Sequence, residues 1–434
     1  MRKCHFNIKT YLKMENQNNV VWTAFEKFIF RACLIFFTTF ALSNGIIPYI
    51  SEAWTAFGHQ IGHWLKGILL GITTVVEHEM NGSGDTSDDY GAQLFFFLFS
   101  IVAAAFWTLI DRKSRSYDTW YYWLRVFIRY SLGLTMMMYG IAKVVPGGQF
   151  AAPNLTLMTR PLGNFTPMGL AWAFFGYSYT YSFFGGFMEL VGGLALFFRR
   201  TTTFGVLLLI TVISNIVMIN FAYDVSVKLY SSIYLLMAFF LLAKDVKRLW
   251  HFLYDVENLE VAPIFDKKIV RFARIAFKSL LLLLAIGFPI YQIFFEDGEL
   301  SGKKSAIHGI YDVESFEKNN KTMPLVLNDT TLWKRIVISE GYGGNEYSGV
   351  INFSIVKRER ASYVINDTTK TINVTFRRDS MQNFTAHYHQ PDSLHLVLEG
   401  VILRDTIKMT MKKFRSPQLE THGFHWISES PHNY

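Results

Sequence analysis

Long apolar runs dominate the first 295 residues of this 434-residue chain. One helix needs about 20 consecutive apolar residues to cross a bilayer core. Runs near or above this length predict membrane-spanning helices at 28–50, 93–110, 126–145, 182–198, 203–222, 226–243 and 273–295. The sequence therefore predicts an α-helical, multi-pass membrane protein with about seven spans, of which 93–110 and 182–198 are short for a bilayer.

The loops between these runs differ in positive charge. Lys and Arg gather before the first run, between the second and third, between the fourth and fifth, and between the sixth and seventh. The positive-inside rule then places the N-terminus in the cytoplasm and the region after the last run outside. A polar lead containing MENQNN precedes the first run, which indicates an uncleaved anchor in the inner membrane of a cell.

The excess of basic residues belongs to the membrane part. Residues 296–434 hold 17 basic and 17 acidic side chains, whereas 1–295 hold 25 basic and 17 acidic ones. This asymmetry is an orientation signal and does not indicate a nucleic-acid surface. The only cysteines, Cys4 and Cys33, exclude a disulfide framework and a cysteine metal site. No flavin, haem or dinucleotide motif is present, so the sequence assigns no catalytic residue and no metal ligand.

The periodicity changes after residue 295. Segments such as TINVTFRR, FTAHYH and LHLVLEG alternate apolar and polar residues, which is typical of strands with one buried face. Turn clusters such as NDTTK and QPDS separate these segments. The sequence therefore predicts an antiparallel β-domain outside the membrane, either a barrel with a lipocalin-like rhythm or a sandwich. A small barrel is filled by side chains or holds one ligand, and both alternatives stay open.

Two of the apolar runs, RYSLGLTMMMYGIAKVVPGGQF and FFGGFMELVGGLALFF, carry a recognisable motif. Its residues are Arg129, Gly133, Gly140, Lys143, Gly186, Glu189, Gly192 and Gly193. In this pattern the chain resembles DoxX-type membrane proteins over residues 126–245. The resemblance implies a four-helix membrane unit, an association with redox enzymes, and a quinone as ligand, because some DoxX relatives are subunits of a thiosulfate:quinone oxidoreductase.

The composition and the motif together predict four segments. They are an N-terminal membrane region with two spans and an outer acidic loop at 1–125, a DoxX-like four-helix unit at 126–250, a cytoplasmic linker with the last span at 251–295, and the extracytoplasmic β-domain at 296–434.

Several polar side chains are predicted to lie at the same depth in the bilayer. Glu189 lies about 10 Å below the outer start of its span, and Lys143 lies near the outer end of the preceding span. The predicted ligand pocket at this outer mouth consists of Lys143, Glu189, Asn220, Asp224 and Lys228. A buried carboxylate is costly unless it is paired, and Lys143 is the nearest cation for Glu189. The cluster is a binding pocket or a structural Lys–Glu lock, and Asp224 with Lys228 belongs to it or only forms a hairpin tip.

Three further clusters are candidates for ligand binding. His387 and His389 share one face of a strand, where they bind a metal or only form a polar outer surface. His59 and His63 share one face of an amphipathic interfacial helix, with the same two interpretations. The candidate Ca²⁺ ligands in the outer loop are Asp85, Asp88 and Asp89. Their spacing matches no complete calcium loop, which favours a solvated turn.

Two functions follow from these features. In the first, the chain is an accessory or redox-linked membrane subunit that binds quinone or lipid at the outer leaflet, with the bilayer and a redox enzyme as partners. In the second, it is a non-redox binding or transport module whose external β-domain captures a hydrophobic ligand.

Overall fold

The structure is a computed structural model. It describes residues 22–43, 48–71, 84–254, 268–291, 304–326, 332–341, 346–353, 357–376, 384–402, 404–414, 417 and 419. The chain divides into two compact units. The helical unit comprises Met1–Ile141 and Gly185–Ile286, and the barrel unit comprises Ala142–Phe184 and Gly287–Tyr434.

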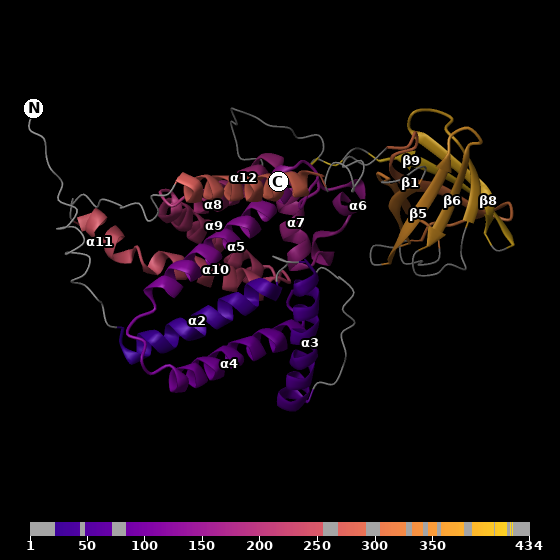
Figure 1. Cartoon of the computed structure of the whole chain (residues 1–434). Helices are drawn as coiled ribbons and strands as arrows, with labels where there is room; N and C mark the ends of the chain where they lie inside the picture. Colours follow the sequence, from indigo (N-terminus) through magenta and orange to yellow (C-terminus); the bar gives the residue numbers. More distant parts are fainter. Residues whose placement is uncertain are drawn as a thin grey trace, which may run out of the picture. The chain divides into compact units, whose positions relative to one another are not determined.

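Helices build the helical unit (Figure 1). They are α2 (Ala24–Ser43), α3 (Pro48–Leu70), α4 (Ser87–Ile110), α5 (Asp118–Val144), α8 (Tyr179–Leu196), α9 (Thr202–Ala222), α10 (Lys228–Ala243), α11 (Val246–Tyr254) and α12 (Lys268–Tyr291), of which α5, α8 and α12 continue into the barrel unit. The bounds of the predicted span at 28–50 change, because α2 ends at Ser43 and a second helix begins at Pro48. Proline has no N–H to donate and suits the first position of a helix.

The main apolar core of the helical unit lies between α2, α5, α9 and α10. It contains the buried side chains of Phe37, Phe40, Leu132, Leu209 and Met237. Of the described helices, α4 and α9 are long and apolar enough to cross a membrane, and α10 is apolar but has only 16 residues. These helices are compatible with a membrane-embedded chain, whereas the number of spans stays a prediction.

Glycines bring two pairs of helices into close contact. A methyl group on Gly140 in α5 would lie 2.6 Å from the carbonyl oxygen of Gly186 in α8. A methyl group on Gly91 in α4 would lie 2.6 Å from the carbonyl oxygen of Gly62 in α3. Only glycine permits such an approach of two backbones, and the close packing of α3 on α4 positions the side chains described below.

The β-domain is a closed antiparallel barrel (Figure 1). Its strands are β1 (Gly309–Lys318), β2 (Lys321–Met323), β3 (Arg335–Ile338), β4 (Glu346–Asn352), β5 (Arg358–Asn366), β6 (Thr371–Phe376), β7 (Phe384–His389), β8 (His395–Ile402) and β9 (Asp405–Lys413). The sheet order is β2-β1-β3-β4-β5-β6-β7-β8-β9, and the pairing of β1 with β9 closes eight strands into a ring, with β2 added to the end of β1. The predicted antiparallel β-domain is confirmed, and the barrel replaces the sandwich alternative.

Apolar side chains fill the barrel interior. One cluster of buried residues includes Tyr311, Trp333, Tyr363, Phe384 and Met409. An eight-stranded barrel is just wide enough to be filled in this way. Of the two alternatives for a small barrel, the described residues therefore match the filled one.

Short helices of the barrel unit follow α5 along the chain. They are α6 (Leu155–Met158), the 3-10 helix η1 (Leu162–Asn164) and α7 (Pro167–Tyr177). Leu155 of α6 packs on Ile310, Val337 and Val350, which lie on β1, β3 and β4. The neighbouring Tyr311, Ile336, Ile338 and Ile351 belong to the interior cluster, so α6 covers the outer face of the barrel wall.

Candidate functional site

A buried ion pair joins α3 to α4. The Lys66 ammonium nitrogen lies 2.7 Å from Oδ1 of Asp88, and the two side chains are only 2% and 5% exposed. Nδ1 of His63 lies 3.6 Å from the same carboxylate oxygen. Lys66, His63 and His59 recur at intervals of three and four residues, which places them on one face of α3. This face meets the first turn of α4 because Gly62 and Gly91 allow the two backbones to touch.

Asp89 links three helices. Thr86 and Asp89 form a capping box at the start of α4, in which Oδ2 of Asp89 accepts hydrogen bonds from the Thr86 N–H at 2.9 Å and the Thr86 hydroxyl at 2.6 Å. The other carboxylate oxygen lies 3.1 Å from Nε2 of His59 in α3. It also accepts a hydrogen bond of 3.3 Å from the Tyr230 hydroxyl in α10.

Asp85 holds the start of α10. Its two carboxylate oxygens accept hydrogen bonds of 2.9 Å from the backbone N–H groups of Lys228 and Leu229. A carboxylate at this position satisfies N–H groups that have no partner within the helix and complements the helix dipole. The Lys228 ammonium lies 3.4 Å from Asp85 and 2.8 Å from Asp224.

The turn between α9 and α10 contains Asp224. This residue adopts a left-handed backbone conformation, with φ of 51°, and its side chain is 80% exposed. Asp tolerates this region better than most residues. Asp224 therefore lies at a hairpin tip, whereas Lys228 is 19% exposed and also contacts Asp85, whose side chain is 8% exposed.

We call this cluster the three-helix network. Its members are His59, His63, Lys66, Asp85, Asp88, Asp89, Asp224, Lys228 and Tyr230. The network holds four carboxylates and two ammonium groups, and the imidazoles of His59 and His63 lie beside two of these carboxylates. The favoured interpretation of a solvated turn is wrong for Asp88 and Asp89, because each is only 4% exposed. In the described ranges no group of three or more His, Cys, Asp or Glu residues has a geometry that could hold a metal ion.

The predicted pocket is brought together in part. Asn220 is buried at the end of α9 and donates a 3.0 Å hydrogen bond to the Ser231 hydroxyl in α10. That hydroxyl in turn donates to the carbonyl of Lys228 at 3.1 Å, so Asn220, Asp224 and Lys228 share the α9–α10 turn. Glu189 is 1% exposed in α8, and Lys143 lies in the last turn of α5. The pairing of these last two residues stays a prediction.

The glycines and the arginine of the sequence motif fasten α5 to α8 and α8 to α9. Both Nε and Nη2 of the buried Arg129 donate to the carbonyl of Leu196, the last residue of α8, at 2.9 and 2.7 Å. Gly133 approaches Gly193, and Gly192 lies against Leu209 of α9. These contacts assign the motif residues a packing role.

The two histidines of β7 point away from the barrel interior. Residues of β7 alternate between buried and exposed, and both His387 and His389 are exposed. The two histidines therefore lie on the polar outer surface of the barrel, and metal binding by them stays a prediction.

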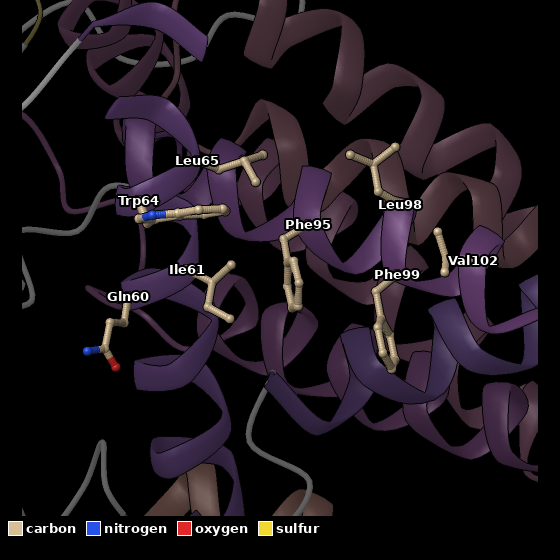
Figure 2. A pocket seen from close by; sticks show the side chains of 8 residues that line it. All are labelled: Gln60, Ile61, Trp64, Leu65, Phe95, Leu98, Phe99 and Val102. Carbon is tan, nitrogen blue, oxygen red and sulfur yellow. The ribbon is translucent and has the colours of Figure 1, made fainter. Parts of the chain in front are cut away.

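An apolar groove runs along α3 and α4 (Figure 2). Its volume is about 630 Å³, and its lining consists of Gln60, Ile61, Trp64, Leu65, Phe95, Leu98, Phe99 and Val102. Trp64 and Leu65 follow directly after His63, so one helix presents ionic groups and groove lining on adjacent faces. The sequence did not predict the groove, because it depends on which helices pair. The spacing of Thr86 and Asp89, typical of a capping box, and the shared helix face of His59 and His63 were local signals for this site.

Comparison with known proteins adds one relative. The chain is 36% identical over 120 residues to "Uncharacterized protein YwoB" of Bacillus subtilis (strain 168), a match that covers 28% of this chain and 75% of YwoB. No family model matches the chain, and no solved structure matches it.

Proposed function

Because the chain belongs to the family of YwoB, whose name states no activity, we propose a function from the geometry. The protein is an integral membrane protein that binds an amphiphile, a lipid or a quinone. The polar group of the amphiphile contacts the three-helix network, and its apolar chain lies in the groove between α3 and α4. The protein acts as an accessory or redox-linked subunit, as the DoxX resemblance implies.

One observation carries this proposal. A charged cluster and an exposed apolar groove are formed by the same two helices, and they lie on adjacent faces of α3. Trp64, Leu98 and Val102 of the groove are 63%, 44% and 66% exposed. A groove of this volume is in the usual range for small-molecule sites, which combine an apolar lining with a few polar groups.

The proposal includes a topology. The chain crosses the inner membrane about seven times, with the N-terminus inside and the barrel outside, as the distribution of Lys and Arg favours. A single cysteine at Thr368, in a chain from which Cys4 and Cys33 have been removed, tests it. An impermeant thiol reagent should label this cysteine in intact cells. Labelling only after lysis would contradict an external barrel.

Mass spectrometry of the co-purified molecules tests the groove. Val102→Trp adds bulk at the groove wall and should remove the amphiphile that purifies with the wild-type protein. Ile110→Trp is the matched control, because Ile110 is 70% exposed on the same helix and does not line the groove. Equal retention in both variants would contradict the proposal.

The nature of the amphiphile separates the two candidate functions. Co-purified quinone with a quinone-dependent spectral change, in the presence of the redox partner, supports the redox-linked subunit. Co-purified lipid without a redox response supports a non-redox binding or transport module. Capture of a hydrophobic ligand inside the barrel has less support, because buried side chains such as Trp333, Tyr363 and Met409 fill the interior.

A further inference from the structure

An unbalanced group of arginines lies where α6 covers the barrel. Strand register aligns Asp312, Arg335, Asn352 and Arg358 in one row across β1, β3, β4 and β5. Asp312 is neutralised within this row, since Nη2 of Arg335 donates to it at 2.9 Å. At the end of the row, Arg358 has no carboxylate partner among the described residues.

Arg358 is held in place but keeps an unused donor. Its Nη2 group donates to the carbonyl of Thr156 and, at 3.1 Å, to the hydroxyl of Thr159, both in or directly after α6. Its Nη1 group is buried and has no hydrogen-bond partner in the described part of the chain, and the same is true of the Thr156 hydroxyl. A buried donor without an acceptor is costly, and an anion placed here would satisfy it.

The positive charges around Arg358 also favour an anion at this place. Burial, followed by the positive charges of Arg160 and Arg360, lowers the pKa of Arg358 to about 10. The nearest acid in sequence, Glu359, belongs to the opposite face of β5 and pairs with Lys357 at 3.8 Å. Asn352, next to Arg358 in the row, has a side-chain amide that can also donate.

We propose that Arg358, together with Arg160 and Arg360, binds the phosphate group of an anionic phospholipid headgroup. This site lies in the barrel unit and is distinct from the three-helix network and its groove. The planar guanidinium matches the oxygens of a phosphate, which is why arginine is common at such sites.

Aromatic side chains in the same unit favour a lipid as the source of the phosphate. The large exposed side chains of α7 and of the start of α8 are Leu170, Phe174, Tyr177, Tyr179, Tyr181, Phe183 and Phe184. In membrane proteins, tyrosine and tryptophan are enriched at the membrane–water interface, where the lipid headgroups meet the apolar core. In the proposed topology, α6 belongs to the outer connection between the predicted spans 126–145 and 182–198, which is the side of the outer-leaflet headgroups.

Lipid binding to the purified full-length protein in detergent tests the site. The probes are a short-chain phosphatidylglycerol, the matching phosphatidylcholine and inorganic phosphate, with the dissociation constant from native mass spectrometry and the melting temperature as readouts. Phosphatidylglycerol should bind and raise the melting temperature. Arg358→Gln should weaken its binding by about tenfold or more, since a hydrogen bond to a charged group contributes about 1.5–3 kcal/mol. Arg360→Gln should have a smaller effect.

Two controls separate binding from folding. Arg404→Gln removes the same charge from the exposed β8–β9 connection and should leave binding unchanged. Thr159→Val removes a contact of Arg358 to the α6 segment without changing the charge. If Thr159→Val weakens binding as much as Arg358→Gln, the arginine acts only through the position of α6 and the proposal fails. Equal binding of phosphatidylcholine, or equally tight binding of inorganic phosphate, would overturn the anionic headgroup as the ligand.

Discussion

Ion pairs of the same length occur in the helical unit and on the barrel, in opposite surroundings. Lys66 lies 2.7 Å from Asp88 with both side chains almost fully buried. Lys408 of β9 lies 2.7 Å from Glu399 of β8 with the two side chains 49% and 48% exposed. The separation of the charges is therefore not what distinguishes the two pairs.

The surroundings decide what each pair contributes. Removing one partner of a buried pair leaves an uncompensated charge away from water and costs about 3–5 kcal/mol, whereas replacing both partners by apolar groups is often nearly neutral. An exposed pair is solvated with or without its partner, and salt screens it. The buried pair Lys66–Asp88 is therefore sensitive to a single change of charge, and the exposed pair Lys408–Glu399 is not.

The largest effect is expected at Lys66 and Asp88. Lys66→Met and Asp88→Asn should each destabilise the detergent-solubilised protein by about 3–5 kcal/mol, because each change strands a buried charge. The double variant should recover most of this loss. The measurement is a double-mutant cycle of unfolding free energies. Additive losses would show that the two side chains do not act as a pair, and the comparison with the barrel would then fail.

The local part of this architecture was predictable from the sequence, and the long-range part was not. Alternation with a period of two is visible within any six residues of β6 or β7, so the β-domain could be predicted from single segments. The barrel closure depends on β1 pairing with β9, which no single segment reports. A buried basic residue within an apolar run, Arg31 in α2, was also not anticipated, since its partners Thr108 and Tyr117 come from segments far away in sequence.

The three-helix network also depends on long-range contacts that the sequence did not predict. The spacing of His59 and His63 indicated a shared face, but nothing local indicated that α4 would supply Asp88 and Asp89 opposite them. The acidic loop looked solvated because Asp and Glu are rarely buried unless they are paired. Pairing is a property of helix contacts, and here these contacts depend on Gly62 and Gly91.

The second prediction extends the comparison to Glu189 and Lys143. If they pair, Glu189→Gln and Lys143→Met should each cost about 3 kcal/mol, at the lower end for a buried pair because Lys143 is only half-buried. The double variant should again be close to wild type in unfolding free energy. Independent, additive effects would leave Glu189 as a buried carboxylate with another partner and would remove Lys143 from the predicted pocket.

The third prediction concerns the pair of His308 and Glu340 in the barrel unit. This pair is less buried than Lys66 and Asp88 and less exposed than Lys408 and Glu399. A hydrogen bond from His308, with further hydrogen bonds from the Ser339 hydroxyl and the Glu340 backbone, lowers the pKa of Glu340 from 4.5 to about 2. Since the folded-state pKa is the lower one, the carboxylate stabilises the fold above pH 4.5, and this contribution is lost as the pH falls from about 4.5 to about 2. Thermal unfolding at pH 5 and pH 2 should show a large difference between wild type and Glu340→Gln only at pH 5. The same difference between wild type and Glu340→Gln at both pH values would show that titration of Glu340 does not contribute to the stability.

The fourth prediction separates the two charges of the α9–α10 turn. Asp224→Asn should leave the melting temperature unchanged, because the carboxylate is 80% exposed. Lys228→Met should lower it, because the change removes the cation beside Asp85, whose side chain is only 8% exposed. If neither change alters the melting temperature, both residues are only charges of the hairpin tip, and Lys228 does not belong to the three-helix network.

The smallest effect is expected at the exposed pair of the barrel, and it completes the comparison with Lys66 and Asp88. Each of Lys408→Gln and Glu399→Gln leaves a partner that water can solvate, so neither change strands a buried charge. The same double-mutant cycle should give a coupling close to zero, and raising the salt concentration should remove whatever coupling is present. A coupling as large as that of the buried pair would mean that cross-strand geometry, and not burial, sets the strength of ion pairs in this protein.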